Sequence, residues 1–259
     1  MKKTKIIIPA LGILLLSTAA SVTGTVAWFS MNEKVSATGM QIKAKGEAGI
    51  AIGAYTANNA TAPVASAFSD TASGCNSSKA DMIPTWTNDA SNWYHAKSVN
   101  TNSAAASAAD GYEKITTNAE SVYLYNKFQL KATGQDTDVF VKNIVVEGGN
   151  SASSSFDNCI RVLVKAGDAV KVFAPVSHAT NEEVLAADLK ADDAVETDLK
   201  FTLVGTGTDD AKIFTALSTT PQDVSLYFFY DGEDADCISD NIPATWQPSN
   251  ITVSFSNTK

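Results

Sequence analysis

The sequence predicts an all-β protein, a jelly-roll-like β-sandwich of about 8–10 strands with one short helix and a large polar insertion. Three observations support this prediction. Short runs rich in Val, Ile, Phe, Tyr and Thr recur along the chain, they are bounded by Gly, Asp, Asn or Pro, and several of them alternate apolar and polar residues, which is the period of a strand with one buried face. The chain has 259 residues, 44% of them hydrophobic, so a single domain can bury a sizeable core.

The expected strands follow one another at short intervals. In chain order they are MQIKAK at 40–45, GIAIGAY at 49–55, SVYLYNKFQLKA at 121–132, DVFVKNIVVEG at 138–148, CIRVLVKAG at 159–167, AVKVFAPV at 169–176, LKFTLVG at 199–205, AKIFTAL at 211–217, DVSLYFFYDG at 223–232 and NITVSFS at 250–256. Between the fifth and sixth runs, Gly167 and Asp168 form a two-residue turn signal, which predicts a β-hairpin.

One segment departs from the strand pattern. Residues 180–183 read T-x-x-E, a capping box, and VLAADLKA follows. We therefore expect a short helix over about residues 181–190 that crosses between strands and covers one end of the sandwich.

The stretch at about 56–110 is dominated by Ala, Ser, Thr, Asn and Asp, and it shows no long strand pattern, although SNWYHAKSV is compatible with a short strand. Such long insertions usually lie on the surface. Its Pro84, Trp86, Trp93 and Tyr94 indicate that part of the insertion packs against the body of the protein. The alternative is that Trp86 and Trp93 form a platform for a carbohydrate or a partner.

The N-terminus has the three parts of a secretory signal. MKKTK is basic, IIIPALGILLL is apolar, and small residues follow in STAASVTGTVA, where Thr25 and Ala27 fit the recognition positions of a signal peptidase that cuts before Trp28. A cut after Ala20 is an alternative, and an uncleaved segment is long enough to serve as a membrane anchor. The expected organisation is a signal peptide or anchor at 1–27 and a single β-sandwich domain at 28–259.

The run GTVAWFSMNEKVSATGMQIKAKGEAGIAI resembles the start of TasA and camelysin-like secreted proteins. The positions that match their junction pattern are Gly24, Thr25, Ala27, Phe29 and Ser30. The resemblance covers roughly residues 1–55 and implies cleavage by a SipW-type signal peptidase, with Trp28 as the new N-terminus. It also implies a jelly-roll subunit of extracellular matrix fibres.

The resemblance leads to an expected function: a secreted, non-enzymatic structural protein of extracellular or biofilm-matrix fibres, found outside the cell or at its surface. Its partners would be other copies of itself and related matrix proteins. The freed N-terminal arm would add as a strand to a neighbouring copy, with its apolar residues filling pockets there: Trp28, Phe29, Met31 and Val35. The alternative is a membrane-tethered surface module that binds a glycan or a protein. A camelysin-like metalloprotease is the least favoured function.

The residues that carry catalysis in known motifs are missing from the sequence. His95 and His178 are the only histidines, no H-E-x-x-H is present, and G-x-S-x-G, the P-loop and the dinucleotide fingerprint are absent. The net charge of -9 argues against nucleic acid as a partner. We expect neither enzymatic activity nor a required cofactor.

One acidic run follows an apolar strand and offers oxygen ligands for Ca²⁺. Its members are Asp231, Glu233, Asp234 and Asp236. The spacing is not that of an EF-hand loop, so a solvated turn is the favoured interpretation.

The three cysteines are an odd count for an exported chain. Cys159 opens one expected strand and Cys237 follows another, so the two could meet at one edge of the sandwich, while Cys75 lies in the insertion. A Cys75–Cys237 disulfide is the preferred pairing, because a loop gains most from being tied down. Three free thiols remain the alternative.

Overall fold

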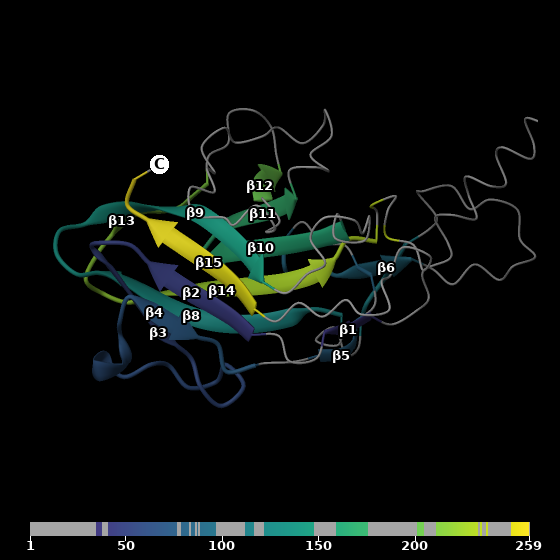
Figure 1. Ribbon diagram of the computed structural model, residues 1–259, viewed down its shortest axis with the longest axis horizontal. Helices are drawn as coiled ribbons and strands as arrows, with labels where there is room; N and C mark the ends of the chain where they lie inside the picture. Colours follow the sequence, from purple (N-terminus) through teal and green to yellow (C-terminus); the bar gives the residue numbers. More distant parts are fainter. Residues whose placement is uncertain are drawn as a thin grey trace, which may run out of the picture.

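The computed structural model describes residues 35–37, 41–76, 79–82, 84, 85, 87, 89–96, 112–116, 122–147, 159–175, 201–204, 211–232, 234, 237 and 250–258. Two β-sheets pack face to face in these ranges (Figure 1). The predicted all-β sandwich is confirmed. All ten expected strands are present, and the two main sheets contain six and five strands, slightly more than predicted.

The larger sheet is antiparallel throughout. From edge to edge its strands are β12 (Phe201–Val204), β11 (Ala169–Pro175), β10 (Ile160–Ala166), β14 (Gln222–Tyr230), β8 (Leu124–Ala132) and β3 (Ile50–Ala54). Gly167 and Asp168 form the turn between β10 and β11, as predicted, and Gly167 has a φ of 57°, a left-handed conformation that glycine adopts without steric cost.

The smaller sheet contains one parallel pair. Its strands are β13 (Lys212–Leu217), β9 (Thr137–Glu147), β15 (Asn250–Ser256), β2 (Gln41–Gly46) and β4 (Thr71–Ser73). The last strand of the chain, β15, lies between β9 and β2, antiparallel to the first and parallel to the second. The sheet is therefore completed only when the C-terminal strand is in place.

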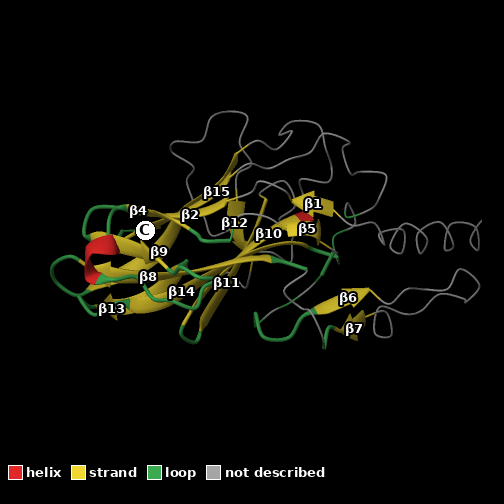
Figure 2. Cartoon of the chain, turned by 90° about the horizontal axis from the view of Figure 1, so that it is seen from below, coloured by secondary structure: helices red, strands yellow, loops and turns green. Residues whose placement is uncertain are grey.

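Two further pairs of strands lie outside the main sheets. β1 (Val35–Ala37) pairs with β5 (Lys79–Met82), and β6 (Tyr94–Ala96) pairs with β7 (Tyr112–Lys114). Both pairs are found beyond the same end of the sandwich, the end opposite the single turn of 3-10 helix η1 (Ala65–Ala67) (Figures 1 and 2). The helix expected over residues 181–190 falls outside the described residues.

The core is the space between the two sheets, and alternation along the strands decides which side chains enter it. In β8, every second residue from Leu124 to Ala132 is buried and the intervening residues are half-buried. The large side chains with under 2% exposure come from both sheets and from the insertion: Tyr230, Phe128, Phe173, Phe228, Phe229, Phe255, Ile42, Ile52, Met82 and Leu124. Burial of those that face the other sheet is the main force that holds the two layers together, whereas Phe229 lies on the outer face and packs on Trp93.

Two of the sheet edges are protected against pairing with another chain. At β3, the main chain of Ile52 exchanges both hydrogen bonds with Ser69, and Pro63 packs against Gly53, so residues 63–69 cover that edge. At β13, the pairing with β9 is irregular, and the Asp138 carboxylate accepts a hydrogen bond from the Ala216 amide. Coverage and irregular pairing are common ways to blunt an edge strand.

Gly74 packs closely against Asn126 of β8, and a substitution at this position can test how tight the packing is. Its neighbour Asn126 is fully buried, accepts a hydrogen bond from the Asn76 amide (2.8 Å) and donates one to the Asn76 carbonyl (2.9 Å). A Cβ at Gly74 would overlap this side chain and lie 2.7 Å from Asn126 Cβ. We expect Gly74→Ala to lower the free energy of unfolding by about 1–3 kcal/mol in urea denaturation followed by tryptophan fluorescence.

The matched control is Gly134→Ala, since a Cβ at Gly134 meets nothing within 4 Å. We expect this variant to stay within about 0.5 kcal/mol of the wild type. Equal effects of the two substitutions would show that the Asn126 contact does not limit the packing.

Candidate functional site

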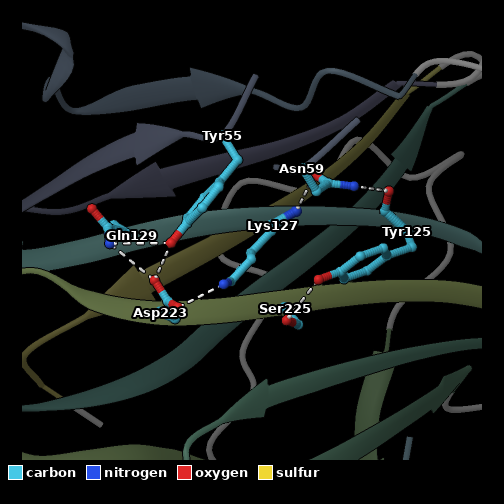
Figure 3. A network of polar contacts seen from close by, with 7 residues as sticks. All are labelled: Tyr55, Asn59, Tyr125, Lys127, Gln129, Asp223 and Ser225. Carbon is cyan, nitrogen blue, oxygen red and sulfur yellow. Dashed lines mark hydrogen bonds and ion pairs between the residues drawn. The ribbon is translucent and has the colours of Figure 1, made fainter. Parts of the chain in front are cut away.

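The outer face of the six-stranded sheet carries an extended set of polar and aromatic contacts. Because side chains alternate along a strand, Tyr125, Lys127 and Gln129 of β8 point away from the core, next to Asp223 and Ser225 of β14. Figure 3 shows these side chains together with Tyr55, which directly follows β3, and Asn59 of the insertion. We call these seven residues the outer-face network.

Asp223 is the centre of the outer-face network. Its Oδ1 accepts hydrogen bonds from the Tyr55 hydroxyl (2.6 Å) and from Gln129 Nε2 (3.0 Å), and its Oδ2 lies 2.7 Å from Lys127 Nζ (Figure 3). The Lys127 ammonium also lies over the Tyr55 ring, 4.4 Å from its centroid, in a cation–π contact. These contacts link β8, β14 and the residue that follows β3.

The charges of this network are fixed near neutral pH. Burial, the largest single influence on Asp223, raises its pKa, but hydrogen bonds from Lys127, Tyr55 and Gln129 outweigh it and hold the pKa below its usual value. Burial raises the pKa of Tyr55, and the bond to Asp223 raises it further. For Lys127, burial lowers the pKa, but Asp223 and Tyr55 reverse the shift and leave it raised. Each pKa is therefore displaced away from neutrality.

Asn59 continues the pairing of β8 where β3 ends. Its side-chain oxygen accepts the Lys127 amide (2.8 Å), and its Nδ2 donates to the Tyr125 carbonyl (3.2 Å). Asn59 has a φ of 65°, and the two preceding residues are also left-handed, a conformation that asparagine tolerates better than most residues. The Asn59 carboxamide thus makes the hydrogen bonds to the Lys127 amide and the Tyr125 carbonyl that a neighbouring strand would otherwise make.

Trp93 covers the apolar part of the same face. It is 3% exposed and packs on Tyr123 (4.4 Å between ring centroids), Phe229 (5.2 Å) and Tyr227 (5.7 Å). Tyr125 stacks on Tyr227 at 4.7 Å and 18°. The prediction that the insertion packs through its aromatic residues is confirmed for Trp93, and the platform alternative is wrong for this residue because its ring is buried. Trp86 lies outside the described residues.

A tight turn presents Trp93 to the sheet. The Asp89 carboxylate accepts hydrogen bonds from the amides of Ser91 (2.8 Å) and Asn92 (2.7 Å). Burial, the largest single influence, raises the pKa of Asp89, but these donors and Thr87 together lower it to about 2. The ionised carboxylate therefore caps the turn at any ordinary pH.

A buried ion cluster lies at the start of β10. The Arg161 side chain is 5% exposed, its Nε lies 3.1 Å from Asp231 Oδ2, and its Nη2 lies 3.0 Å from Asp234 Oδ2. Its Nη1 donates to the carbonyl of Ile160 (3.1 Å). The sequence pattern does not single out Arg161, because one basic residue in a strand usually marks an exposed position.

This cluster bears on the predicted calcium ligands. Two of the four, Asp231 and Asp234, are described, and both form ion pairs with Arg161, whose positive charge neutralises them in place of a metal ion. Glu233 and Asp236 lie outside the described residues. Within the described part of the chain, no group of three or more His, Cys, Asp or Glu side chains could hold a metal ion.

The predicted junction and most of the arm fall outside the described residues, namely Thr25, Ala27, Trp28, Phe29 and Met31. Val35 belongs to β1, where it pairs with Met82. His95 is in β6, and His178 is not described. In the ranges that are described, no helix is long and apolar enough to cross a membrane.

The cysteine pairing differs from the prediction. All three thiols are free: Cys75 is exposed, while Cys159 and Cys237 are buried. The preferred Cys75–Cys237 pairing is wrong in this structure, because both thiols are free and the exposed Cys75 thiol contacts Asn59, whereas Cys237 is buried in the core together with Cys159. The spacing of cysteines could not decide this, because the end of β14 and the start of β10 are brought together only by the sheet pairing.

Comparison of the chain with protein-family models, curated proteins and solved structures finds no match.

Arg161 provides a test of the ion cluster. Replacing it with methionine keeps much of the side-chain volume but leaves the buried carboxylates of Asp231 and Asp234 without the guanidinium. Loss of one partner of a buried ion pair costs about 3–5 kcal/mol. We expect Arg161→Met to reduce the free energy of unfolding by about this amount in urea denaturation.

The control for this variant is Lys142→Met, which removes an exposed ion pair with Glu47 at 3.8 Å. Exposed pairs contribute about 0–1 kcal/mol. A loss for Arg161→Met no larger than that for Lys142→Met would contradict a structural role for the cluster.

Proposed function

We propose that this protein is a secreted, non-enzymatic structural subunit that assembles with copies of itself into extracellular fibres by exchanging its N-terminal arm. The observation that carries the proposal is the position of β1. This strand pairs with β5 and belongs to neither main sheet, so both sheets are built from β2 onward in the described residues. The arm can therefore leave without removing a strand from the sandwich.

The same pairing supplies an acceptor. When β1 leaves, β5 offers an unpaired edge, and β1 of the next copy restores the register in which Val35 pairs with Met82. Met82 is fully buried and belongs to the core, so β5 stays on the body of its own subunit during the exchange. Exchange of an identical element between copies re-forms existing contacts, and a head-to-tail exchange that does not close gives a filament.

The sequence supports the release of the arm. TVAWFS at 25–30 follows a basic, then apolar, then small-residue segment, and cleavage before Trp28 places Trp28, Phe29 and Met31 at the free end of the arm. A short apolar arm ahead of β1 gives the exchange more buried surface than three paired residues alone. The partner of the protein is then a second copy of this chain, after export and cleavage by a signal peptidase of the SipW type.

Deletion of residues 28–37 tests the exchange. This variant keeps the acceptor β5 but cannot donate an arm, so it should form no fibres in electron micrographs. Added in small amounts to the intact protein, it should end growing fibres and shorten them, because each copy can accept but not extend. Unchanged circular dichroism would verify that the variant folds, and fibres of normal length would contradict the proposed exchange.

The second candidate function is a membrane-tethered module that binds a glycan or protein ligand. The observation that favours it is the half-exposed outer face, where Tyr125, Lys127 and Asp223 offer an aromatic ring beside charged groups. Because Trp93 is buried, the ligand would contact the outer-face network instead.

N-terminal sequencing of the protein from cells separates the two functions. The fibre proposal expects Trp28 as the first residue of protein released into the medium. The tethered module expects an intact N-terminus, beginning at Met1 or Lys2, in the membrane fraction. Recovery of the protein solely in that intact, membrane-bound form would overturn the fibre proposal.

A further inference from the structure

The two buried cysteines lie at the point where the β10–β14 pair ends. Cys159 directly precedes β10, and the register pairs Ile160 with Tyr230, the last residue of β14. Beyond β14 the chain turns back toward Cys159: the Asp231 amide donates to the Cys159 carbonyl (2.7 Å), and the Cys237 amide donates to the Asp234 carbonyl (3.0 Å). The first bond ties the end of β14 to the residue directly before β10, and the second ties Cys237 to Asp234, which follows β14 closely in the chain.

The two thiols are buried close to each other. Cys159 is 0% exposed and Cys237 is 5% exposed, and both belong to the same buried core cluster, where Cys237 is close enough to perturb the Cys159 thiol. Burial raises the pKa of the Cys159 thiol, and the neighbouring Cys237 raises it further. A disulfide needs its two main-chain segments close together, and the hydrogen bond from the Asp231 amide to the Cys159 carbonyl brings the segment after β14 to Cys159.

The surroundings favour a cross-link over a metal site. The charged groups beside the thiols, Arg161, Asp231 and Asp234, are engaged in the ion cluster described above. A structural zinc site needs four ligands, usually cysteine or histidine. Among the described residues, no group of three or more His, Cys, Asp or Glu side chains could hold a metal ion.

We propose that Cys159 and Cys237 form a disulfide when the chain folds in the presence of a disulfide donor. The Cys237 thiolate attacks the donor disulfide, giving a mixed disulfide and releasing one donor thiolate. The Cys159 thiolate then attacks the Cys237 sulfur and releases the second donor thiolate. In sum, the two protein thiols lose two protons and two electrons, and the donor disulfide is reduced to two thiols.

The bond would form during folding, before both sulfur atoms are buried. It closes a loop that contains β10 to β14 and ties the turn after β14 to the start of β10. Such a cross-link stabilises the native state mainly by restricting the unfolded chain. The inference does not depend on fibre assembly; it requires only that the folding chain meets an oxidant of the disulfide class.

Thiol counting and peptide mapping test the proposal. The chain is refolded from denaturant with oxidised and reduced glutathione, alkylated, digested and examined by mass spectrometry. We expect alkylatable thiols to fall from the three of the reduced chain to one, and a cross-linked peptide pair that contains Cys159 and Cys237. In Cys75→Ser, the same cross-link should form and leave no thiol to alkylate.

Thermal unfolding measures the consequence. The oxidised wild type and oxidised Cys75→Ser should each unfold about 5–10 °C above their own reduced forms, and this difference should vanish in Cys159→Ala. Comparing redox forms of one chain keeps the test valid even if Cys159→Ala folds poorly. Cross-links that join Cys75 to either partner, or three alkylatable thiols after oxidative refolding, would overturn the proposal.

Discussion

The second half of strand β14 is apolar on both faces, and much of the structure follows from the need to cover both. One face enters the core through Val224, Leu226 and Phe228, as expected for a sandwich strand. The other face carries Tyr227 and Phe229, which are also buried. A single sheet-on-sheet contact can cover only the first face, so the second would form an exposed apolar patch unless another segment packed on it. The insertion supplies that segment through Trp93.

Covering the outer face of β14 also organises one end of the sandwich. The main chain of Thr85, between β5 and Trp93, donates to the Tyr230 carbonyl and accepts the Gly232 amide. The next residue of the strand end, Asp231, donates to the Cys159 carbonyl and contacts Arg161. The proposed acceptor β5, the ion cluster and the thiol pair are thus joined through a few residues at the end of β14. A disulfide at Cys159–Cys237 would brace the strand end on which the acceptor segment rests.

The local pattern of the sequence was enough to predict ten of the eleven strands in the two main sheets, all but β4, but not their partners. Ten strand-like runs correspond to strands, because alternation and turn residues act over a few positions. The parallel pairing of β15 with β2 has no local signal, since it joins the two ends of the domain. The same limit explains the cysteines: the residues beside Cys159 and Cys237 do not reveal that β10 and β14 are neighbours.

The outer-face network was beyond sequence reasoning for a related reason. Alternation along β8 places Tyr125, Lys127 and Gln129 on one face, which could have been read from the sequence. Asp223 joins the network because of the register of β14 against β8. Asn59 reaches the edge of β8 because it and the two residues before it adopt left-handed conformations. The burial of Arg161 could not be predicted either, because the two carboxylates that pair with it follow a different strand, β14.

The position of β15 bears on how an exchange of arms could occur in a folded protein. β2 follows the arm in the chain, and both of its edges are occupied, one by β15 and the other by β4. The first strand of the sandwich is therefore held in place independently of the arm, and its buried Ile42 and Ala44 stay in the core. In the proposed assembly, only the pairing of β1 with β5 must open. The free energy that this costs is limited to the contacts of the three residues of β1 and the surface that the arm buries. A subunit whose first core strand lay at a sheet edge would lose more strand pairing when it donated its N-terminus. In this chain, the segment that would be exchanged, β1, is separate from the first strand of the core, β2.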